Sequence, residues 1–88
     1  MHYVYVLCSS KDSNLYVGRT NNFRRRLAEH NDGESFATAP RRPFTLTYYE
    51  AYAGESDAIH REKSLKLRGR ARKHLMTRLS ASLRQARS

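Results

Sequence analysis

The chain has 88 residues, with 17 lysine and arginine residues against 8 aspartate and glutamate residues, which gives a formal net charge of +9. A chain of this length forms one small domain, and so large a positive excess favours an anionic partner, nucleic acid first, over a membrane surface. Its single cysteine, Cys8, excludes an intramolecular disulfide and a cysteine-based zinc site.

The N-terminal segment, MHYVYVLCSS, is too short for a signal peptide and lacks its basic start. No apolar run approaches the roughly 20 residues that cross a bilayer. We therefore expect a soluble cytoplasmic protein with no membrane partner and no small-molecule cofactor. Residues Tyr3–Cys8 are almost wholly apolar or aromatic, which predicts a strand buried on both faces in the middle of a sheet.

A second strand and a helix are predicted next. The turn-forming run SSKDSN precedes Leu15–Val17, so this strand is expected to pair with the first as an antiparallel hairpin. We expect Gly18 to end the strand and to let another backbone or a ligand come close. Asn21 or Asn22 is suited to cap the helix that follows, and Gly33 to lie just past its end.

The first helix places polar groups beside an apolar stripe. At about 3.6 residues per turn, Phe23, Leu27 and His30 fall on one side of the helix, with Arg26 beside them. A cation and an imidazole, four residues apart, therefore flank the side that faces the sheet. The alternative is a solvated arginine run with one histidine at the boundary.

A loop and a third strand follow this helix. Two prolines exclude regular structure from residues 34–43, in which Arg41 and Arg42 add charge. The segment Phe44–Tyr52 has the alternation of a strand.

The second helix is expected to begin at a cap, Ser56 or Asp57, and to run to about Arg68. Glu62 falls inside the apolar stripe of this helix. An unpaired buried carboxylate is costly, so such a group is usually paired with a cation or bound to a metal. Two alternatives stay open: a structural salt bridge to Arg26 or a neighbouring lysine, and a metal ligand.

A third helix, from Arg70, combines an apolar stripe with basic residues that include Lys73. We expect residues 1–84 to form one domain and residues 85–88 to fray. The predicted order is β-β-α-β-α-α. The expected fold is α+β, with a three-stranded antiparallel sheet flanked by helices.

Five polar side chains of these elements suit the hydrolysis of a phosphodiester: Tyr5, Tyr16, Arg26, His30 and Glu62. The reaction needs a group that takes a proton, a cation that stabilises the phosphorane charge, and usually a carboxylate that holds a divalent metal. A single carboxylate suits one Mg²⁺ ion, which keeps most of its waters. The alternative for the two tyrosines is that they are core residues of the hairpin with solvated hydroxyls.

The sequence resembles the GIY-YIG nuclease superfamily, in particular its small stand-alone bacterial members of the UPF0213 type. The YVY of residues 3–5 is similar to the first motif of the family, and the YVG of residues 16–18 to the second, with ten residues between them. Arg26 and His30 match the R-x-x-x-H that follows, and Glu62 matches the glutamate of the family. The resemblance extends over most of the chain. Relatives often carry Lys-Tyr-Thr before the third strand, whereas the sequence here is FAT at residues 36–38, which lacks a cation and a hydroxyl.

The resemblance implies a role for each matching residue. Tyr16 resembles the tyrosine that acts as general base or holds the nucleophilic water, and Tyr5 the tyrosine that shares this task. Arg26 matches the arginine that contacts the scissile phosphate, and His30 lies close to the nucleophile. Glu62 matches the ligand of one Mg²⁺ or Mn²⁺ ion.

Nucleic-acid contacts are expected from further basic residues. Arg19 occupies a position that is lysine in some relatives, where it would polarise a tyrosine or touch phosphate. Arg41 and Arg42, together with Arg70 and Lys73 of the third helix, would suffice for binding, because phosphate contacts supply most non-specific affinity.

These observations predict a metal-dependent DNA endonuclease that hydrolyses phosphodiester bonds, with structured or damaged DNA as one option and DNA repair or recombination as its setting. Two alternatives remain. One is a non-catalytic nucleic-acid-binding module on the same fold, and the other is a protein-interaction domain whose charge only keeps it in solution. Binding without salt dependence would contradict both nucleic-acid hypotheses.

Overall fold

The computed structural model describes residues 1–34 and 38–87. It confirms the α+β class and the three-stranded antiparallel sheet, and it adds a helix at the C-terminus, so that the order is β-β-α-β-α-α-α. The elements are β1 (His2–Ser9), β2 (Leu15–Thr20), α1 (Phe23–Asn31), a 3₁₀ turn (Ala39–Arg41), β3 (Phe44–Tyr52), α2 (Glu55–Leu67), α3 (Gly69–Arg78) and α4 (Ser80–Arg87). Within the described residues, no helix is both long and apolar enough to span a lipid bilayer.

The strand order is β2-β1-β3, with β1 antiparallel to both neighbours. This confirms that the apolar strand is central. The prediction that Gly18 ends the second strand is wrong, because β2 continues to Thr20 and Gly18 pairs with Tyr5. A Cβ atom at Gly18 would overlap the hydroxyl and ring of Tyr5. The close approach that this glycine permits is therefore made by a tyrosine side chain.

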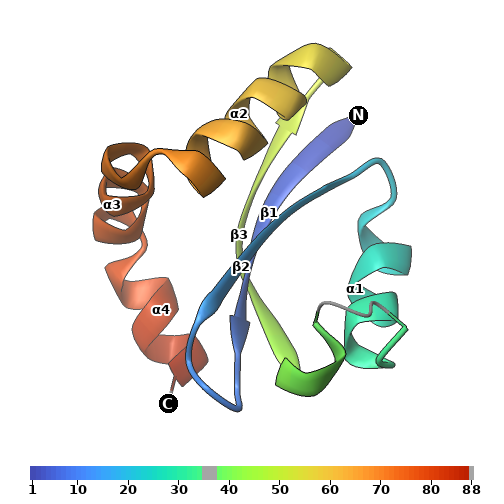
Figure 1. The fold of residues 1–88 in the computed structure, drawn as a ribbon, viewed down its shortest axis with the longest axis vertical. Helices are drawn as coiled ribbons and strands as arrows, with labels where there is room; N and C mark the ends of the chain where they lie inside the picture. Colours follow the sequence, from blue (N-terminus) through green and yellow to red (C-terminus); the bar gives the residue numbers. More distant parts are fainter. Residues whose placement is uncertain (35–37, 88) are drawn as a thin grey trace.

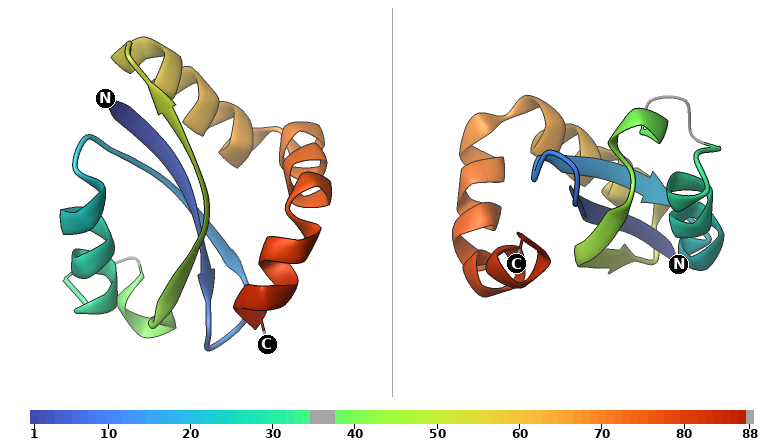
Figure 2. Two further views of the ribbon diagram at one scale, coloured as in Figure 1. Left: turned by 180° about the vertical axis from the view of Figure 1, so that it is seen from behind. Right: turned by 90° about the horizontal axis from the view of Figure 1, so that it is seen from below.

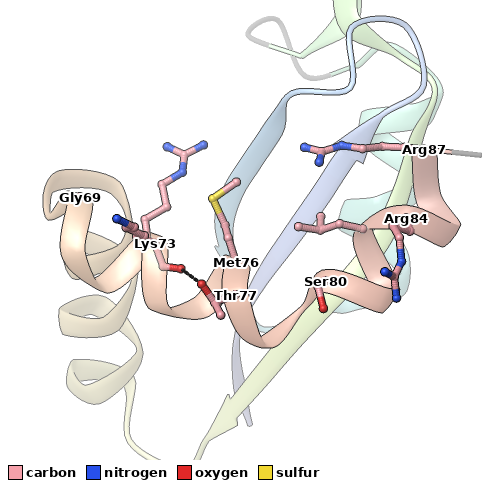
Figure 3. A pocket seen from close by; sticks show the side chains of 9 residues that line it. Gly69, Lys73, Met76, Thr77, Ser80, Arg84 and Arg87 are labelled. Atoms are coloured by element: carbon pink, nitrogen blue, oxygen red, sulfur yellow. Dashed lines mark hydrogen bonds between the residues drawn. The ribbon is translucent and has the colours of Figure 1, made fainter.

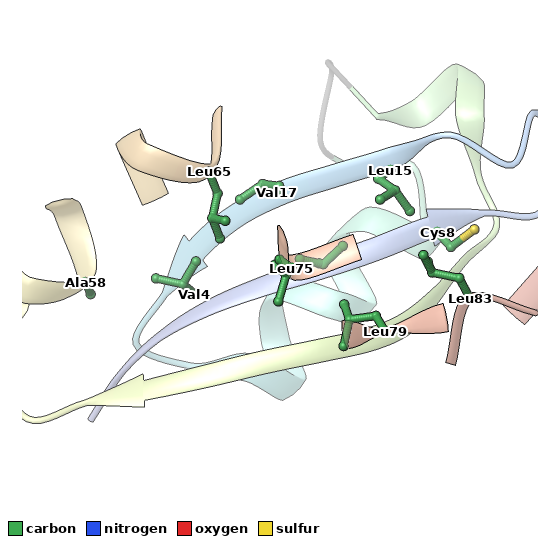
Figure 4. Packing of buried hydrophobic residues seen from close by; sticks show 10 residues of the cluster. Val4, Cys8, Leu15, Val17, Ala58, Leu65, Leu75, Leu79 and Leu83 are labelled. Atoms are coloured by element: carbon green, nitrogen blue, oxygen red, sulfur yellow. The ribbon is translucent and has the colours of Figure 1, made fainter. Parts of the chain in front are cut away.

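Helices cover both faces of the sheet (Figure 1). Helix α1 lies on one face, while α2, α3 and α4 lie along the other, and the views from behind and below show the same two layers (Figure 2). Residues Val4, Val6 and Cys8 of β1 pack in the core under α2–α4, as Figure 4 shows for part of that cluster. Tyr5 and Leu7 pack in the smaller core on the α1 face. The central strand is thus buried on both sides, as predicted.

The ends of the first two helices follow their local sequences. The Asn22 side chain caps α1 by accepting the backbone N–H of Arg25 at 3.2 Å, and Gly33 has a φ of 79° just past the helix end, as expected. The expected caps of the second helix are wrong, because α2 begins at Glu55 with Gly54 as its N-cap. Acidic residues fill the first turn instead, where they complement the helix dipole.

The predicted last helix is two helices. The chain bends at Leu79, whose N–H reaches the carbonyls of Leu75 and Met76. The bend keeps the apolar stripe against the curved sheet, since Leu75, Leu79 and Leu83 are all buried. Helix α4 extends to Arg87, whose guanidinium donates to the Ser13 carbonyl at 2.9 Å. Residues 85–87, expected to fray, are therefore helical.

Candidate active site

The centre of the site is a buried chain of side-chain contacts from β1, α1 and the loop before β3. His30 has no exposed surface, and its Nε2 lies 3.0 Å from the Tyr5 hydroxyl. Its Nδ1 lies 2.7 Å from the Thr38 hydroxyl. Arg26, one turn before His30, hydrogen-bonds the Tyr5 side chain and also pairs with Glu29 at 3.0 Å. Arg26 and His30, four residues apart on α1, therefore both face Tyr5, as their spacing in the sequence predicted.

The protonation of this chain follows from its burial. Burial, and next the positive charge of Arg26, hold the pKa of His30 below its ordinary value of 6.5. Burial also raises the pKa of Tyr5 to about 12, against the smaller opposite effect of the Arg26 hydrogen bond. At neutral pH the imidazole is therefore neutral and Tyr5 keeps its proton.

The state of His30 predicts how stability depends on pH. Because its pKa is lowered in the fold, the unfolded chain binds a proton below pH 6.5 that the folded chain does not. The free energy of unfolding should fall as the pH drops from about 6.5 toward the folded-state pKa, by at most about 1.4 kcal/mol per pH unit. Urea denaturation over this pH range should show that the free energy of unfolding depends less steeply on pH in His30→Gln than in the wild type. The exposed His74→Gln is the control and should keep the wild-type slope; equal slopes in all three proteins would contradict this account.

Tyr16 lies beside this chain with its ring exposed in part. Its ring centroid is 5.0 Å from that of His30 and 6.5 Å from that of Tyr5. The ammonium of Lys66 lies 5.9 Å from the centre of the Tyr16 ring. Among the described residues the Tyr16 hydroxyl makes no hydrogen bond. Of the two tyrosines, Tyr16 is the one whose hydroxyl is available to a ligand.

Glu62 reaches the site from α2. Its side chain is 20% exposed, so it lies at the margin of the core and not inside the apolar stripe. Oε2 is 3.1 Å from Nζ of Lys66, and Oε1 is 3.4 Å from Nε of Arg19. Arg19 also lies 3.7 Å from Glu55. The cations beside Glu62 are therefore a neighbouring lysine and Arg19, and not Arg26 as the salt-bridge alternative suggested.

The site extends around the edge strand β2. Tyr16 belongs to the core on the α1 face, whereas its neighbour Val17 packs under α2–α4. Arg19 has the same orientation as Val17 and meets Glu62 on α2. Lys66 connects the two sides, because it contacts both Glu62 and the Tyr16 ring. Tyr16 and the carboxylate of Glu62 thus border one strip of surface along β2.

The remaining predicted nucleic-acid contacts lie elsewhere. Arg41 pairs with Asp12, in the turn between β1 and β2, at 3.1 Å, whereas Arg42 donates to the carbonyl of Ala39, in its own loop, at 3.0 Å. Arg70 and Lys73 lie on α3 and border different pockets. Two contributors were not named from the sequence. Lys66, one helical turn after Glu62, is the neighbouring lysine of the salt-bridge alternative. The contact of Thr38 with His30 depends on tertiary structure.

Comparison with known proteins identifies the family of this chain. The model of the GIY-YIG catalytic domain matches residues 1–79. The chain belongs to the GIY-YIG family. It is therefore a member of a nuclease family, and GIY-YIG nucleases typically use divalent metals and nucleic-acid substrates. Residues 36 and 37, at which the sequence departs from relatives before β3, lie outside the described part of the structure.

Its relatives identify it as a small GIY-YIG protein of the UPF0213 type. UPF0213 protein SH2523 of Staphylococcus haemolyticus is 41% identical over 73 residues, which cover 82% of this chain and 88% of that protein. UPF0213 protein VNG_2274C of Halobacterium salinarum is 41% identical over 78 residues, which cover 86% and 99%. The solution NMR structure of UPF0213 protein BH0048 from Bacillus halodurans is similar with a TM-score of 0.55 and 33% identity, over 86% of this chain and 82% of that one.

Proposed function

We propose that this GIY-YIG protein is a metal-dependent DNA endonuclease with Tyr16 as the proton acceptor. The observation that carries the proposal is the unequal surroundings of the two tyrosines. The hydroxyl of Tyr5 is committed to His30 at 3.0 Å and its pKa is raised to about 12, so it cannot accept a proton near neutral pH. The hydroxyl of Tyr16 has no partner among the described residues, and its ring lies beside the ammonium of Lys66, which pairs with Glu62.

Each residue then has one task in an attack of water on phosphorus. In its tyrosinate form, Tyr16 orients the water and takes its proton. Tyr5 and His30 position the Tyr16 ring, because they pack against it and are themselves fixed by hydrogen bonds. Arg26, next to Tyr5, supplies positive charge where the phosphorane develops negative charge. Arg19 fixes the carboxylate of Glu62 from the other side of β2.

The donor set at Glu62 fits one hard cation that keeps most of its waters. Among the described residues, no three histidine, cysteine or acidic side chains gather closely enough to form a metal cage. One partly exposed carboxylate is what Mg²⁺ uses when waters and substrate phosphate complete its coordination. A divalent cation at this position would polarise the phosphate and stabilise the developing charge. Mg²⁺ and Mn²⁺ are the ions that we propose.

Lys66 is expected to compete with that cation, because its ammonium lies 3.1 Å from Glu62 Oε2. Lys66→Gln should tighten Mn²⁺ binding by about two- to fivefold, which corresponds to the roughly 0.4–1 kcal/mol of a partly exposed ion pair. Isothermal titration calorimetry without DNA measures this directly. Lys63→Gln removes the same charge from an exposed position of α2 and is the control. The same change of affinity in both variants would assign the effect to net charge alone.

A second candidate function is a nucleic-acid-binding module without catalysis. The cations already in place beside both oxygens of Glu62 favour it, since a carboxylate neutralised by Arg19 and Lys66 needs no metal. Incubation of supercoiled plasmid and of branched DNA with Mg²⁺, with Mn²⁺ or with a chelator separates the two. Nicking that requires the metal supports the endonuclease. Salt-sensitive binding without nicking in any of these conditions would leave the binding module.

A further inference from the structure

The net positive charge of the chain is confined to its last part. Residues 1–62 contain eight lysine and arginine residues and eight aspartate and glutamate residues, so their formal charges cancel. Residues 63–88 contain nine lysine and arginine residues and no acidic residue. The whole formal charge of +9 therefore belongs to the end of α2, to Arg68 after it, and to α3 and α4. The half of the molecule that supplies the tyrosines is electrically neutral.

A groove lies within this basic layer, between α3 and α4. It has a volume of about 530 Å³ and is bordered by four cationic side chains, those of Arg72, Lys73, Arg84 and Arg87. Figure 3 shows Lys73 on α3 and Arg84 and Arg87 on α4, on either side of the groove. Methionine, leucine and small polar residues form the rest of its lining, and no carboxylate does.

The cations of this groove have no negative partner. Among residues 1–34 and 38–87, no ion pair involves Arg72, Lys73 or Arg84. Arg87 donates only to a backbone carbonyl, that of Ser13. Unpaired like charges held close together repel one another, so an anion that enters the groove removes an unfavourable interaction. The groove is therefore complementary to an extended polyanion.

We propose that this groove, which we call the α3–α4 groove, binds the phosphodiester backbone of duplex DNA next to the bond that is cut. The proposal rests on the endonuclease function for its choice of DNA. Helices α3 and α4 together have a contour of about 27 Å at about 1.5 Å per residue. That length spans several successive phosphates of one strand, which follow one another at about 3.4 Å along the duplex axis.

The α3–α4 groove adjoins the candidate active site through β2. At one end, Arg87 contacts Ser13 in the turn just before β2. At the other end, Gly69 follows Lys66 by three residues, and Lys66 lies over the ring of Tyr16 in β2. A DNA strand that leaves the groove along β2 therefore reaches Tyr16. Lys66 is the cation between the two sites.

A second basic pocket, on the other side of α3, is a weaker candidate. It is bordered by Arg61, Arg68, Arg70 and Arg78, but Arg61 is neutralised there by Glu50 at 2.9 Å. Among the described residues, the ion pair of its basic side chains leads to Glu50 of β3 and not to β2. The sequence indicated two residues of α3, Arg70 and Lys73, as nucleic-acid contacts. Of these, we assign the contact with the DNA backbone to Lys73, which borders the α3–α4 groove.

The two sides of α3 provide a matched test. The variant Lys73→Gln/Arg84→Gln removes one exposed cation from each wall of the groove. The control Arg68→Gln/Arg78→Gln removes two exposed cations that border the other pocket. Binding of a fluorescent duplex, measured by anisotropy over a range of NaCl concentrations, gives the slope of log affinity against log salt. Thermal denaturation verifies that both variants fold.

For the groove variant we expect the slope of log affinity against log salt to be smaller in magnitude by the contribution of close to two phosphate contacts, at about 0.9 per contact. For the control variant we expect almost no change of slope. Equal changes in the two variants, or wild-type binding that does not respond to salt, would overturn the proposal. Cleavage separates it from the endonuclease proposal. Groove-dependent binding without cleavage would refute the endonuclease and leave the groove, whereas equal cleavage by both variants below saturating DNA would refute the groove alone.

Discussion

Glu62→Gln is expected to lower DNA cleavage by about 10³-fold or more and to leave DNA binding intact. Glutamine has the shape of glutamate but lacks the charge that holds a divalent cation, and such a cation contributes several kcal/mol to charge stabilisation, at about tenfold in rate per 1.4 kcal/mol. The partners of Glu62, Arg19 and Lys66, remain as free cations. Binding should therefore be as tight as in the wild type or tighter, whereas cleavage should be lost.

Glu55→Gln is the matched control for this prediction. Glu55 is also on α2 and also lies near Arg19, at 3.7 Å, but its side chain is 62% exposed and it has no contact with the tyrosines. Plasmid nicking by the two variants, at equal protein and Mg²⁺ concentrations, provides the comparison. If Glu62→Gln nicked DNA as fast as Glu55→Gln, Glu62 would be a structural ion-pair residue and not the ligand of a catalytic metal.

The second large effect is expected for Tyr16→Phe, which should reduce cleavage by about 10²–10⁴-fold, the usual contribution of a positioned proton acceptor. The substitution removes one oxygen that has no partner among the described residues, so the fold should keep its stability. The rate of the chemical step should fall while the affinity for DNA stays unchanged. Single-turnover cleavage, at enzyme concentrations above the dissociation constant, measures that step.

Tyr49→Phe controls for the general loss of a tyrosine hydroxyl. Tyr49 lies on β3 against Tyr3 and Phe23, and it is 53% exposed. Its variant should cut at the wild-type rate. A wild-type rate for Tyr16→Phe, together with a large loss for Tyr5→Phe, would exchange the roles that we assign to the two tyrosines.

The sequence predicted the strands and helices well because their signals are local. Alternation and apolar runs located all three strands, and helical spacing brought Arg26 and His30 to the face that meets Tyr5. The extent of β2 was missed since Gly18 is usually a strand breaker, and here its missing side chain makes room for a tyrosine ring. The break at Leu79 was missed because the apolar stripe continues through it.

The surroundings of Glu62 could not be predicted from spacing along the chain. Its contact with Arg19 depends on how α2 lies over the edge of β2, and this is set by the packing of the whole sheet. The contact between His30 and Thr38 likewise joins two segments through tertiary structure. The positive net charge could be read from the composition, but its location in a groove could not. The groove between α3 and α4 forms only because the chain bends at Leu79.

Cleavage and binding of one labelled branched DNA by the wild-type protein, measured in the same samples with Mg²⁺ and with a chelator, test the central claim most directly. The account predicts that the protein binds the DNA in both conditions and cuts it only with the metal, at the strip of surface along β2 where Lys66 connects Tyr16 and Glu62. Salt-sensitive binding with no cut strand under either condition would contradict it, and would make this GIY-YIG protein a DNA-binding module.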